Sequence, residues 1–288
     1  MFFCVKFKKI IIFVFLGLIG VLIFTAIIRL SVSAYTKSRG IHVPIIMYHS
    51  ILNNSAQLGD YVLSPVTLEE DMIYLKDNGY TTIFVGDLIN YVYKDGTLPE
   101  KPVILTFDDG FYNNYTYVLP LLEKYDMKAD ISVVGSYSQK FSDIDEKKPA
   151  YAYLDWKTIC NMVKTKRIEI GNHSYNMHTN DSKRKGCTIN KGETPESYRN
   201  VFMGDTVALQ NKLKDNCGFE PQFYTYPFGF YSNETVENLK ALGFKASLTV
   251  AEKPNYITKD KNCLFNLNRY NRPSGISTYQ FMTKALKF

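Results

Sequence analysis

From residue 44 onward, short apolar segments alternate with segments that show the apolar spacing of helices. We expect strands at 44–49, 81–85, 102–107, 129–135, 167–172, 222–227 and 244–250. We expect helices at 67–80, 117–126, 155–165, 195–218 and 233–243. This alternation is typical of an α/β fold in which helices cover a mostly parallel sheet. With about seven strand–helix units, a barrel is favoured over an open sheet.

The N-terminus carries an unbroken apolar run from Ile10 to Ile28. A helix of about 20 such residues crosses a membrane, and the lysines before the run place that end in the cytoplasm. We therefore predict a single-pass anchor in the cell membrane with an extracytoplasmic catalytic domain. A secreted protein released by signal cleavage is the alternative, because VSA at 32–34 resembles a cleavage site. The expected parts are a cytoplasmic segment at 1–9, a transmembrane helix at 10–28, a linker at 29–43 and one domain at 44–288.

The distribution of charge excludes one class of partner. The chain has a net charge of +6, but residues 1–39 hold six basic residues and no acid. Without them, the basic residues number as many as the 28 acids, so the main domain is formally neutral. We therefore expect no nucleic-acid partner.

Four of the five cysteines would lie outside the cell, where disulfides persist. Their spacing matches no zinc-finger pattern. A bridge between Cys187 and Cys217 and a set of free buried thiols both remain open.

Polar side chains follow four of the expected strands. His49 ends the first strand, Asp108 and Asp109 follow the third, His173 follows the fifth, and Tyr226 ends the sixth. In an α/β barrel the carboxyl ends of the strands gather at one rim, where active sites form. The sequence therefore predicts a functional site at this rim.

The motif HSYNMH places His173 and His178 five positions apart. In a helix or a strand this spacing would direct the two rings to different sides, but a loop can bring them together. Two surface histidines without a ligand are the alternative. Two imidazoles and one carboxylate form a three-ligand metal site with room for water, which is a catalytic arrangement.

The adjacent carboxylates of Asp108 and Asp109 fit the same site. One carboxylate would bind the ion, and the other would accept a proton from the water that the ion activates. Gly110 permits a tight turn that points both side chains the same way. A hairpin turn is the alternative, but the strand before it does not alternate and a helix is expected after it.

Four motifs together resemble the polysaccharide deacetylase family, which is also called carbohydrate esterase 4 or the NodB homology group. They are PIIMYHS at 44–50, TFDDG at 106–110, HSYNMH at 173–178 and YPFG at 226–229. The resemblance covers 44–285, and the histidine spacing is most similar to the branch that de-N-acetylates poly-N-acetylglucosamine. It implies a distorted (β/α)7 barrel. It also implies metal-dependent hydrolysis of the N-acetyl amide in N-acetylglucosamine units of an extracellular or cell-wall polysaccharide, with release of acetate.

The resemblance also implies roles for individual residues. Asp108 would be the general base, and Asp109, His173 and His178 would bind a divalent metal, usually zinc in this family. The backbone N–H of Tyr226 would stabilise the oxyanion of the tetrahedral intermediate.

The chain departs from the family pattern in two places. No arginine stands beside YPFG to orient the base, and the C-terminal region CLFNLNRYNRP has no histidine to act as general acid. We name His49 as the candidate acid because it ends a strand at the same rim. A structural role for His49, with the proton supplied through the bound water, is the alternative.

Three functional hypotheses remain open from the sequence. The first is an anchored glycan N-deacetylase that acts on poly-N-acetylglucosamine or on peptidoglycan. The second is a catalytically weak or inactive surface module that binds metal and carbohydrate, which the missing C-terminal histidine favours. The third is a hydrolase of a small amide, because a fold does not dictate a substrate.

Overall fold

The computed structural model describes residues 16–21, 23–25 and 40–287, and the chain divides into the units Met1–Ile41 and His42–Phe288. Residues 16–21 and 23–25 are helical. Within these described residues, no helix is long and apolar enough to cross a membrane. Much of the predicted span at 10–28 lies outside the described residues, so the anchor stays a prediction.

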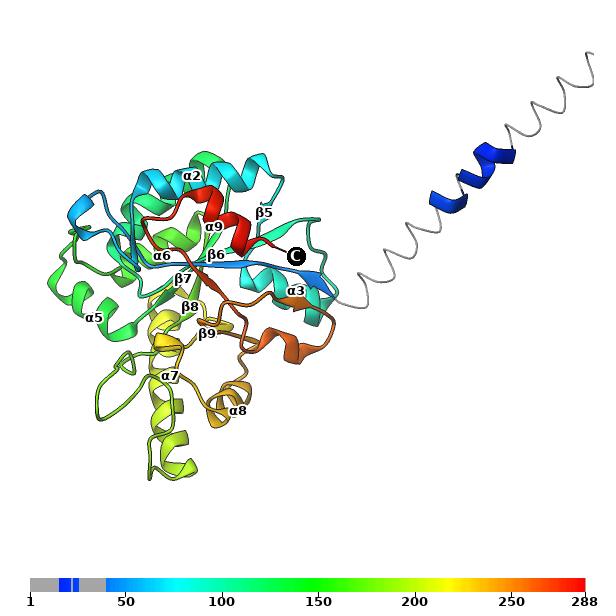
Figure 1. The fold of residues 1–288 in the computed structure, drawn as a ribbon. Helices are drawn as coiled ribbons and strands as arrows, with labels where there is room; N and C mark the ends of the chain where they lie inside the picture. The colour runs from blue at the N-terminus through cyan, green and yellow to red at the C-terminus, as the bar shows by residue number, and fades with distance from the viewer. Residues whose placement is uncertain (1–15, 22, 26–39, 288) are drawn as a thin grey trace, which may run out of the picture. The chain divides into compact units, whose positions relative to one another are not determined.

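A parallel sheet forms the centre of the unit His42–Phe288 (Figure 1). In spatial order its strands are β10 (Ala246–Leu248), β9 (Phe223–Thr225), β8 (Ile168–Asn172), β7 (Ala129–Val133), β6 (Pro102–Phe107), β2 (Ile45–Tyr48) and β12 (Tyr270–Asn271), and β5 (Thr81–Thr82) pairs with β6 beside this path. A parallel bridge between Leu248 and Leu267 joins β10 to the segment that leads into β12. The sheet is therefore a distorted half-barrel of parallel strands. The parallel α/β arrangement that the alternation of segments predicted is confirmed, whereas the complete barrel that it favoured is present only as a half-barrel.

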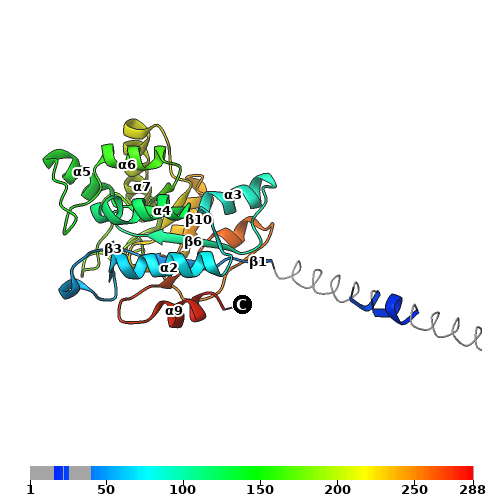
Figure 2. The same ribbon diagram turned by 90° about the horizontal axis from the view of Figure 1, so that it is seen from above.

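Short strands and helices complete the unit. The strands outside the main sheet are β1 (Ile41–His42), β3 (Ser50–Ile51), β4 (Val62–Leu63) and β11 (Tyr256–Ile257). The α-helices are α2 (Pro65–Asp77), α3 (Val85–Lys94), α4 (Leu119–Tyr125), α5 (Gly135–Ile144), α6 (Trp156–Lys164), α7 (Pro195–Cys217), α8 (Asn233–Ala241) and α9 (Thr278–Ala285). Single turns are η1 (Ser55–Gln57), η2 (Asn114–Val118), η3 (Pro227–Gly229) and η4 (Lys261–Leu264). Seen from above, α2 and α9 lie side by side although they are far apart in sequence (Figure 2).

Local capping signals set the helix ends. The side chain of Asp155 accepts a hydrogen bond from the Thr158 N–H at the start of α6. Gly218 ends α7 in the left-handed conformation with φ 78°, at the predicted end of this helix. Helix α2 begins earlier than the predicted residue 67 because Ser64 is its N-cap.

Strand β6 lies at the centre of the core. All six of its residues are buried, and it pairs with β7, β2 and β5. Burial on both faces explains its uninterrupted apolar sequence. The residues that follow it therefore leave the core at the carboxyl edge of the sheet, beside the ends of β2 and β7.

A disulfide between Cys160 and Cys217 joins α6 to the end of α7. The Cys187–Cys217 pairing considered from the sequence was wrong, since Cys187 is a free, buried thiol 2.9 Å from the Tyr224 hydroxyl. The bridged residues are 57 positions apart, and closing such a loop stabilises a fold by about 4 kcal/mol in the chain-entropy account.

Candidate active site

Asp108 and Asp109 leave β6 through a tight turn. The Asp108 N–H still donates to the Tyr48 carbonyl at 3.0 Å, which continues the ladder with β2. Asp109 and Gly110 then adopt left-handed conformations with φ 71° and 72°. A Cβ on Gly110 would lie 2.9 Å from the Val133 side chain, so glycine is required by space as well as by conformation. The turn places both carboxylates on the wall of one cavity.

Asp109 lies between two imidazoles. Its Oδ1 is 3.4 Å from His173 Nε2 and 3.1 Å from His178 Nε2, and the three ligand atoms all lie within 4.8 Å of one another. Two ligands bound to one tetrahedral ion at about 2.0–2.1 Å are themselves about 3.3 Å apart. The donor set and its spacing therefore fit a divalent metal ion such as zinc.

Hydrogen bonds outside the ligand set orient the two histidines. His173 Nδ1 is 2.8 Å from the Thr225 carbonyl oxygen, so the Nδ1–H donates to this carbonyl and Nε2 faces Asp109. His178 Nδ1 is 3.5 Å from the Tyr137 hydroxyl. Both rings thus present Nε2 to the same point, as the loop interpretation of HSYNMH required.

The cluster holds its carboxylate in the ionised form. Burial raises the pKa of Asp109, but hydrogen bonds from His173 and His178 outweigh it and hold that pKa far below its usual range. Burial lowers the pKa of His173, but Asp109 and Asp108 raise this pKa by more, so the net pKa lies above its usual value. Asp109 is therefore ionised at neutral pH.

Asp108 has a partner that sequence reasoning missed. Arg269 donates to both of its carboxylate oxygens, at 2.7 Å from Nη1 and 2.8 Å from Nη2. Arg269 is fully buried, and its Nε donates to the Thr249 carbonyl at 2.7 Å. From the sequence we expected no arginine to orient Asp108, and this expectation was wrong. The guanidinium comes from the segment NRYNRP at 268–273, which is far from YPFG in the chain. A pair of arginines in a segment that leads into a strand was the only signal in the sequence.

Arg269 also determines the protonation of Asp108. Burial raises the pKa of this carboxyl, but the charge and hydrogen bonds of Arg269 lower it more, so the net pKa lies below the usual range. The bidentate contact fixes the orientation of the carboxylate as well.

His49 lies at the same site. Its Nε2 is 3.9 Å from Asp108 Oδ2, and its carbonyl accepts a hydrogen bond from Asn114 Nδ2 at 3.0 Å. Burial lowers the pKa of His49, although Asp108 and Asp109 oppose this effect. The structure therefore brings His49 beside the carboxylate at a distance too long for a direct hydrogen bond.

The structure contradicts the role expected for Tyr226. Its N–H donates to the Leu248 carbonyl at 3.1 Å within the sheet, so it is not available to an oxyanion. Its side chain is fully buried, and its hydroxyl donates to Ser247 Oγ at 2.8 Å. Tyr226 is therefore a residue of the sheet and the core.

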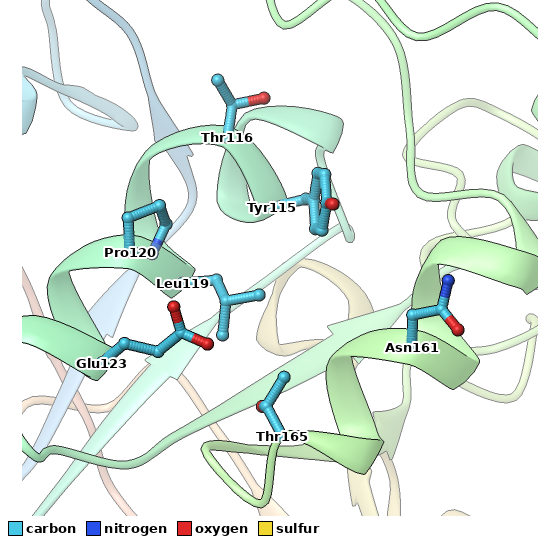
Figure 3. A pocket seen from close by; sticks show the side chains of 7 residues that line it. All are labelled: Tyr115, Thr116, Leu119, Pro120, Glu123, Asn161 and Thr165. Carbon is cyan, nitrogen blue, oxygen red and sulfur yellow. The ribbon is translucent and has the colours of Figure 1, made fainter.

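The cavity at this site has a volume of about 540 Å³. Its lining combines the polar groups described above with aromatic and apolar side chains, among them Tyr61, Phe111, Phe228, Phe230 and Val250. A separate groove of about 500 Å³ lies between α4 and α6, where Glu123 is the one acidic group among the side chains in Figure 3. The three candidate metal ligands and Asp108 therefore line one cavity, at the carboxyl end of the sheet.

The family model described as polysaccharide deacetylase matches residues 95–247, which is more than half of the chain. The chain belongs to the polysaccharide deacetylase family. The resemblance inferred from the four motifs is thereby confirmed.

Individual relatives of this polysaccharide deacetylase are distant. It is 25% identical over 224 residues to the poly-beta-1,6-N-acetyl-D-glucosamine N-deacetylase of Escherichia coli K12. This match covers 71% of this chain and 33% of that protein. It is 28% identical over 254 residues to the putative polysaccharide deacetylase YxkH of Bacillus subtilis, which covers 86% of this chain and 78% of that protein. The chain thus spans about a third of the length of the Escherichia coli relative.

Solved structures show the same fold. The deacetylase PplD of Streptococcus pyogenes, in complex with acetate, superposes with a TM-score of 0.69 at 23% identity and covers 85% of this chain and 99% of that chain. IcaB from Ammonifex degensii superposes with a TM-score of 0.70 at 24% identity and covers 86% of this chain and 98% of that chain. The half-barrel is therefore the fold of these deacetylases.

Proposed function

We propose that this polysaccharide deacetylase hydrolyses the N-acetyl amide of N-acetylglucosamine units in an extracellular or cell-wall polysaccharide and releases acetate. The observation that carries the proposal is the convergence of Asp109, His173 and His178 on one point, with Asp108 beside them. Family membership and the named substrate of several relatives support a glycan as substrate.

The metal would be held by Asp109, His173 and His178, and zinc is our proposal because two imidazoles and a carboxylate suit it. When bound, a divalent ion polarises the amide carbonyl and makes a water molecule more acidic. The chain's own contribution is to hold Asp108 next to this position in its ionised form.

Asp108 would accept the proton of the attacking water as general base. Its pKa is held low, so it is ionised over the whole neutral range, at the expense of basicity. Arg269 donates to both carboxylate oxygens and stops the side chain from rotating away. The proton must then reach the leaving amine, and His49, 3.9 Å from Asp108, is the donor that we propose.

A backbone donor for the oxyanion is proposed at Phe228 in place of Tyr226. Phe228 is the second residue of the single turn η3 and lies two positions after Tyr226. Its side chain lines the cavity of the site. An N–H at this position would stabilise negative charge on the carbonyl oxygen of the substrate.

We further propose that the domain at 44–288 works outside the cytoplasm, anchored by 10–28 through the linker at 29–43, or secreted after cleavage. The disulfide between Cys160 and Cys217 supports an oxidising compartment. As substrate we propose poly-β-1,6-N-acetylglucosamine and not peptidoglycan, because relatives in two bacterial genera are named as deacetylases of this polymer.

The test combines metal analysis with an acetate-release assay on the full-length protein. Zinc-loaded protein should release acetate from β-1,6-linked N-acetylglucosamine oligomers, and His178→Ala should lose both bound zinc and activity. His42→Ala, which changes the one histidine outside the cluster, is the matched control. A protein that binds zinc but releases no acetate from these oligomers or from peptidoglycan would contradict the proposal and favour the inactive surface module.

A further inference from the structure

Two exposed aromatic side chains line the active-site cavity. Tyr61 is 59% exposed and Phe228 is 43% exposed, and both share the cavity with Asp108 and Asp109. An exposed ring gains free energy when an apolar surface covers it, and the flat face of a pyranose ring is such a surface. Each ring could therefore hold a sugar.

Tyr61 is held in place by its neighbours. The Ser50 N–H donates to the Tyr61 carbonyl at 3.1 Å, and Asn271 Nδ2 donates to the Asp60 carbonyl at 3.0 Å. Its ring meets the His49 ring edge-on, with centroids 4.7 Å apart. This aromatic surface is thus preorganised beside the proposed proton donor.

Phe228 points to the cavity from a disfavoured backbone conformation. Its φ is 56°, and among the described residues it is the single aromatic residue with a positive φ. Bulky residues rarely adopt this conformation, and such strain gathers at functional sites. Its ring centroid lies 4.5 Å from that of His178, on the metal side of the site.

The two rings lie on different sides of the reacting groups. Along the carboxyl edge of the sheet, β6 leads to the two aspartates and lies between β2, which His49 follows, and β9, which leads to Phe228. We propose that Tyr61 and Phe228 stack on the sugars that precede and follow the unit being deacetylated. This inference rests on the proposed function and makes the substrate a unit inside a chain, with a neighbour on each side.

Binding can be measured apart from catalysis. In full-length protein carrying Asp108→Asn, calorimetry should show tighter binding of the β-1,6-linked N-acetylglucosamine trimer than of the monosaccharide. Tyr61→Ala or Phe228→Ala in this background should each weaken trimer binding roughly threefold to tenfold. Tyr61→Phe keeps the ring and should keep the affinity of the parent.

Tyr115→Ala is the matched control, because it removes a tyrosine that is 40% exposed in the separate groove of Figure 3. Unchanged trimer affinity in both cavity variants overturns the proposal, as does a parent protein that binds no trimer. The acetate assay on wild-type protein decides the proposed function separately. Trimer binding that depends on both rings, without acetate release, would keep the sugar-binding surfaces and reject hydrolysis.

The loop between the two metal-binding histidines carries an independent inference. Asp205 of α7 accepts hydrogen bonds from the Tyr175 N–H at 2.8 Å and the Asn176 N–H at 2.7 Å, one on each carboxylate oxygen. The Ser174 hydroxyl is buried and finds no partner among the described residues. Asp205 therefore binds this loop from α7, in addition to the bonds that the Ser174 and Tyr175 carbonyls accept from the Gly135 and Ser136 N–H groups of α5.

We infer that Asp205 is a positioning residue that sets the separation of His173 and His178. The two N–H groups that it binds lie between the histidines in the chain, so both imidazoles are fixed relative to α7. Hydrogen bonds to an ionised acceptor are roughly twice as strong as neutral ones. Loss of this charge would let the loop move and the ligand atoms separate.

Zinc affinity of the metal-stripped, full-length protein tests this role. Asp205→Asn turns one acceptor into a donor and should weaken zinc binding roughly 10-fold to 100-fold. Asp215→Asn, at an exposed position of the same helix, is the matched control and should bind like wild type.

Asp205→Glu keeps the charge and should retain more zinc affinity than Asp205→Asn. A folded Asp205→Asn protein with unchanged zinc affinity overturns the inference. A lower melting temperature of the metal-free protein with unchanged affinity would show that Asp205 is purely structural.

Discussion

Arg269 and Arg272, three positions apart, each form a buried two-point ion pair with an aspartate, but the two pairs differ in what surrounds them. Arg272 binds Asp71 at 2.9 and 3.1 Å, and that carboxylate also accepts from the hydroxyls of Thr278 and Tyr48. Asp108 has Arg269 as its partner for both oxygens and lines the active-site cavity.

The difference separates a structural pair from a functional one. The Asp71 pair joins α2 to the segment that precedes α9, and neither side chain is exposed. Burial raises the pKa of Asp71 in spite of Arg272, whereas Arg269 brings the pKa of Asp108 below its usual range. The same chemical pair thus serves packing where every acceptor is used. Where a carboxylate still faces a cavity, it serves catalysis in the function that we propose.

The largest expected effect is on turnover when the two aspartates are changed in the same way. Asp108→Asn should lower acetate release per folded molecule by roughly 10²-fold to 10⁴-fold, because the general base is lost. Asp71→Asn should leave this rate near that of wild type. Equal rates for the two variants, after correction for folded fraction, would remove the functional distinction.

The next effect concerns stability. Arg272→Met leaves Asp71 buried without its cation, which should lower the free energy of unfolding by about 3–5 kcal/mol. Chemical denaturation with two probes would measure it. A loss below about 1 kcal/mol would show that the Tyr48 and Thr278 hydroxyls satisfy Asp71 without the arginine.

Arg269→Met, the matched change in the other pair, should act on the pH profile. Without the guanidinium the pKa of Asp108 rises, so the acidic limb of kcat/KM should move to higher pH, with a rate loss of roughly 10-fold to 100-fold near neutral pH. A pH profile that keeps its position would contradict the role of Arg269 in lowering this pKa.

The smallest effect extends the comparison to a buried acid without an arginine. Asp130 of β7 lies opposite Glu169 of β8, and their carboxylates accept from the N–H groups of Val85 and Gly86 at the start of α3. Burial raises the pKa of Asp130 well above its ordinary value, and Glu169 raises it further. Burial thus favours the protonated form of Asp130, whereas Asp71 and Asp108 are each paired with an arginine.

A raised pKa in the folded state stabilises the fold below the unfolded pKa of about 4 and loses this contribution as pH rises through the folded value. Asp130→Asn should reduce the fall in the free energy of unfolding as pH rises. Above the folded-state pKa of Asp130, the variant should be more stable than wild type by on the order of 1 kcal/mol. Urea denaturation at a series of pH values would measure it. A mutant whose stability falls with pH as steeply as wild type would contradict a proton shared by these carboxyls.

Regular elements with a strong local signal were predictable from the sequence. Strand β6 has the predicted bounds, 102–107, because a run that is apolar on both faces has few alternatives. Helix α5 was missed because GSYSQKFSDI shows no apolar stripe, and the helix forms by packing against its neighbours. The segment expected as a strand at 81–85 forms β5 only at its start, because Val85 already begins α3.

The site divides in the same way. Adjacent acids after a buried strand and two histidines in one loop were visible as motifs, and the structure brings Asp109, His173 and His178 together. Tyr226 was misplaced because a motif does not show which N–H groups the sheet uses. Arg269 and Asp205 could not be assigned, since their partners are distant in the chain and no local pattern marks them.

The sequence by itself determined the fold class, the family and the side chains that meet at the candidate site, because these follow from local periodicity and from short motifs. Only the tertiary structure decided which arginine orients Asp108, which anion holds the histidine loop and which backbone donors remain for a substrate. These depend on contacts between residues far apart in the chain, and such contacts exist only once β6, β8, α7 and the C-terminal segment have packed together.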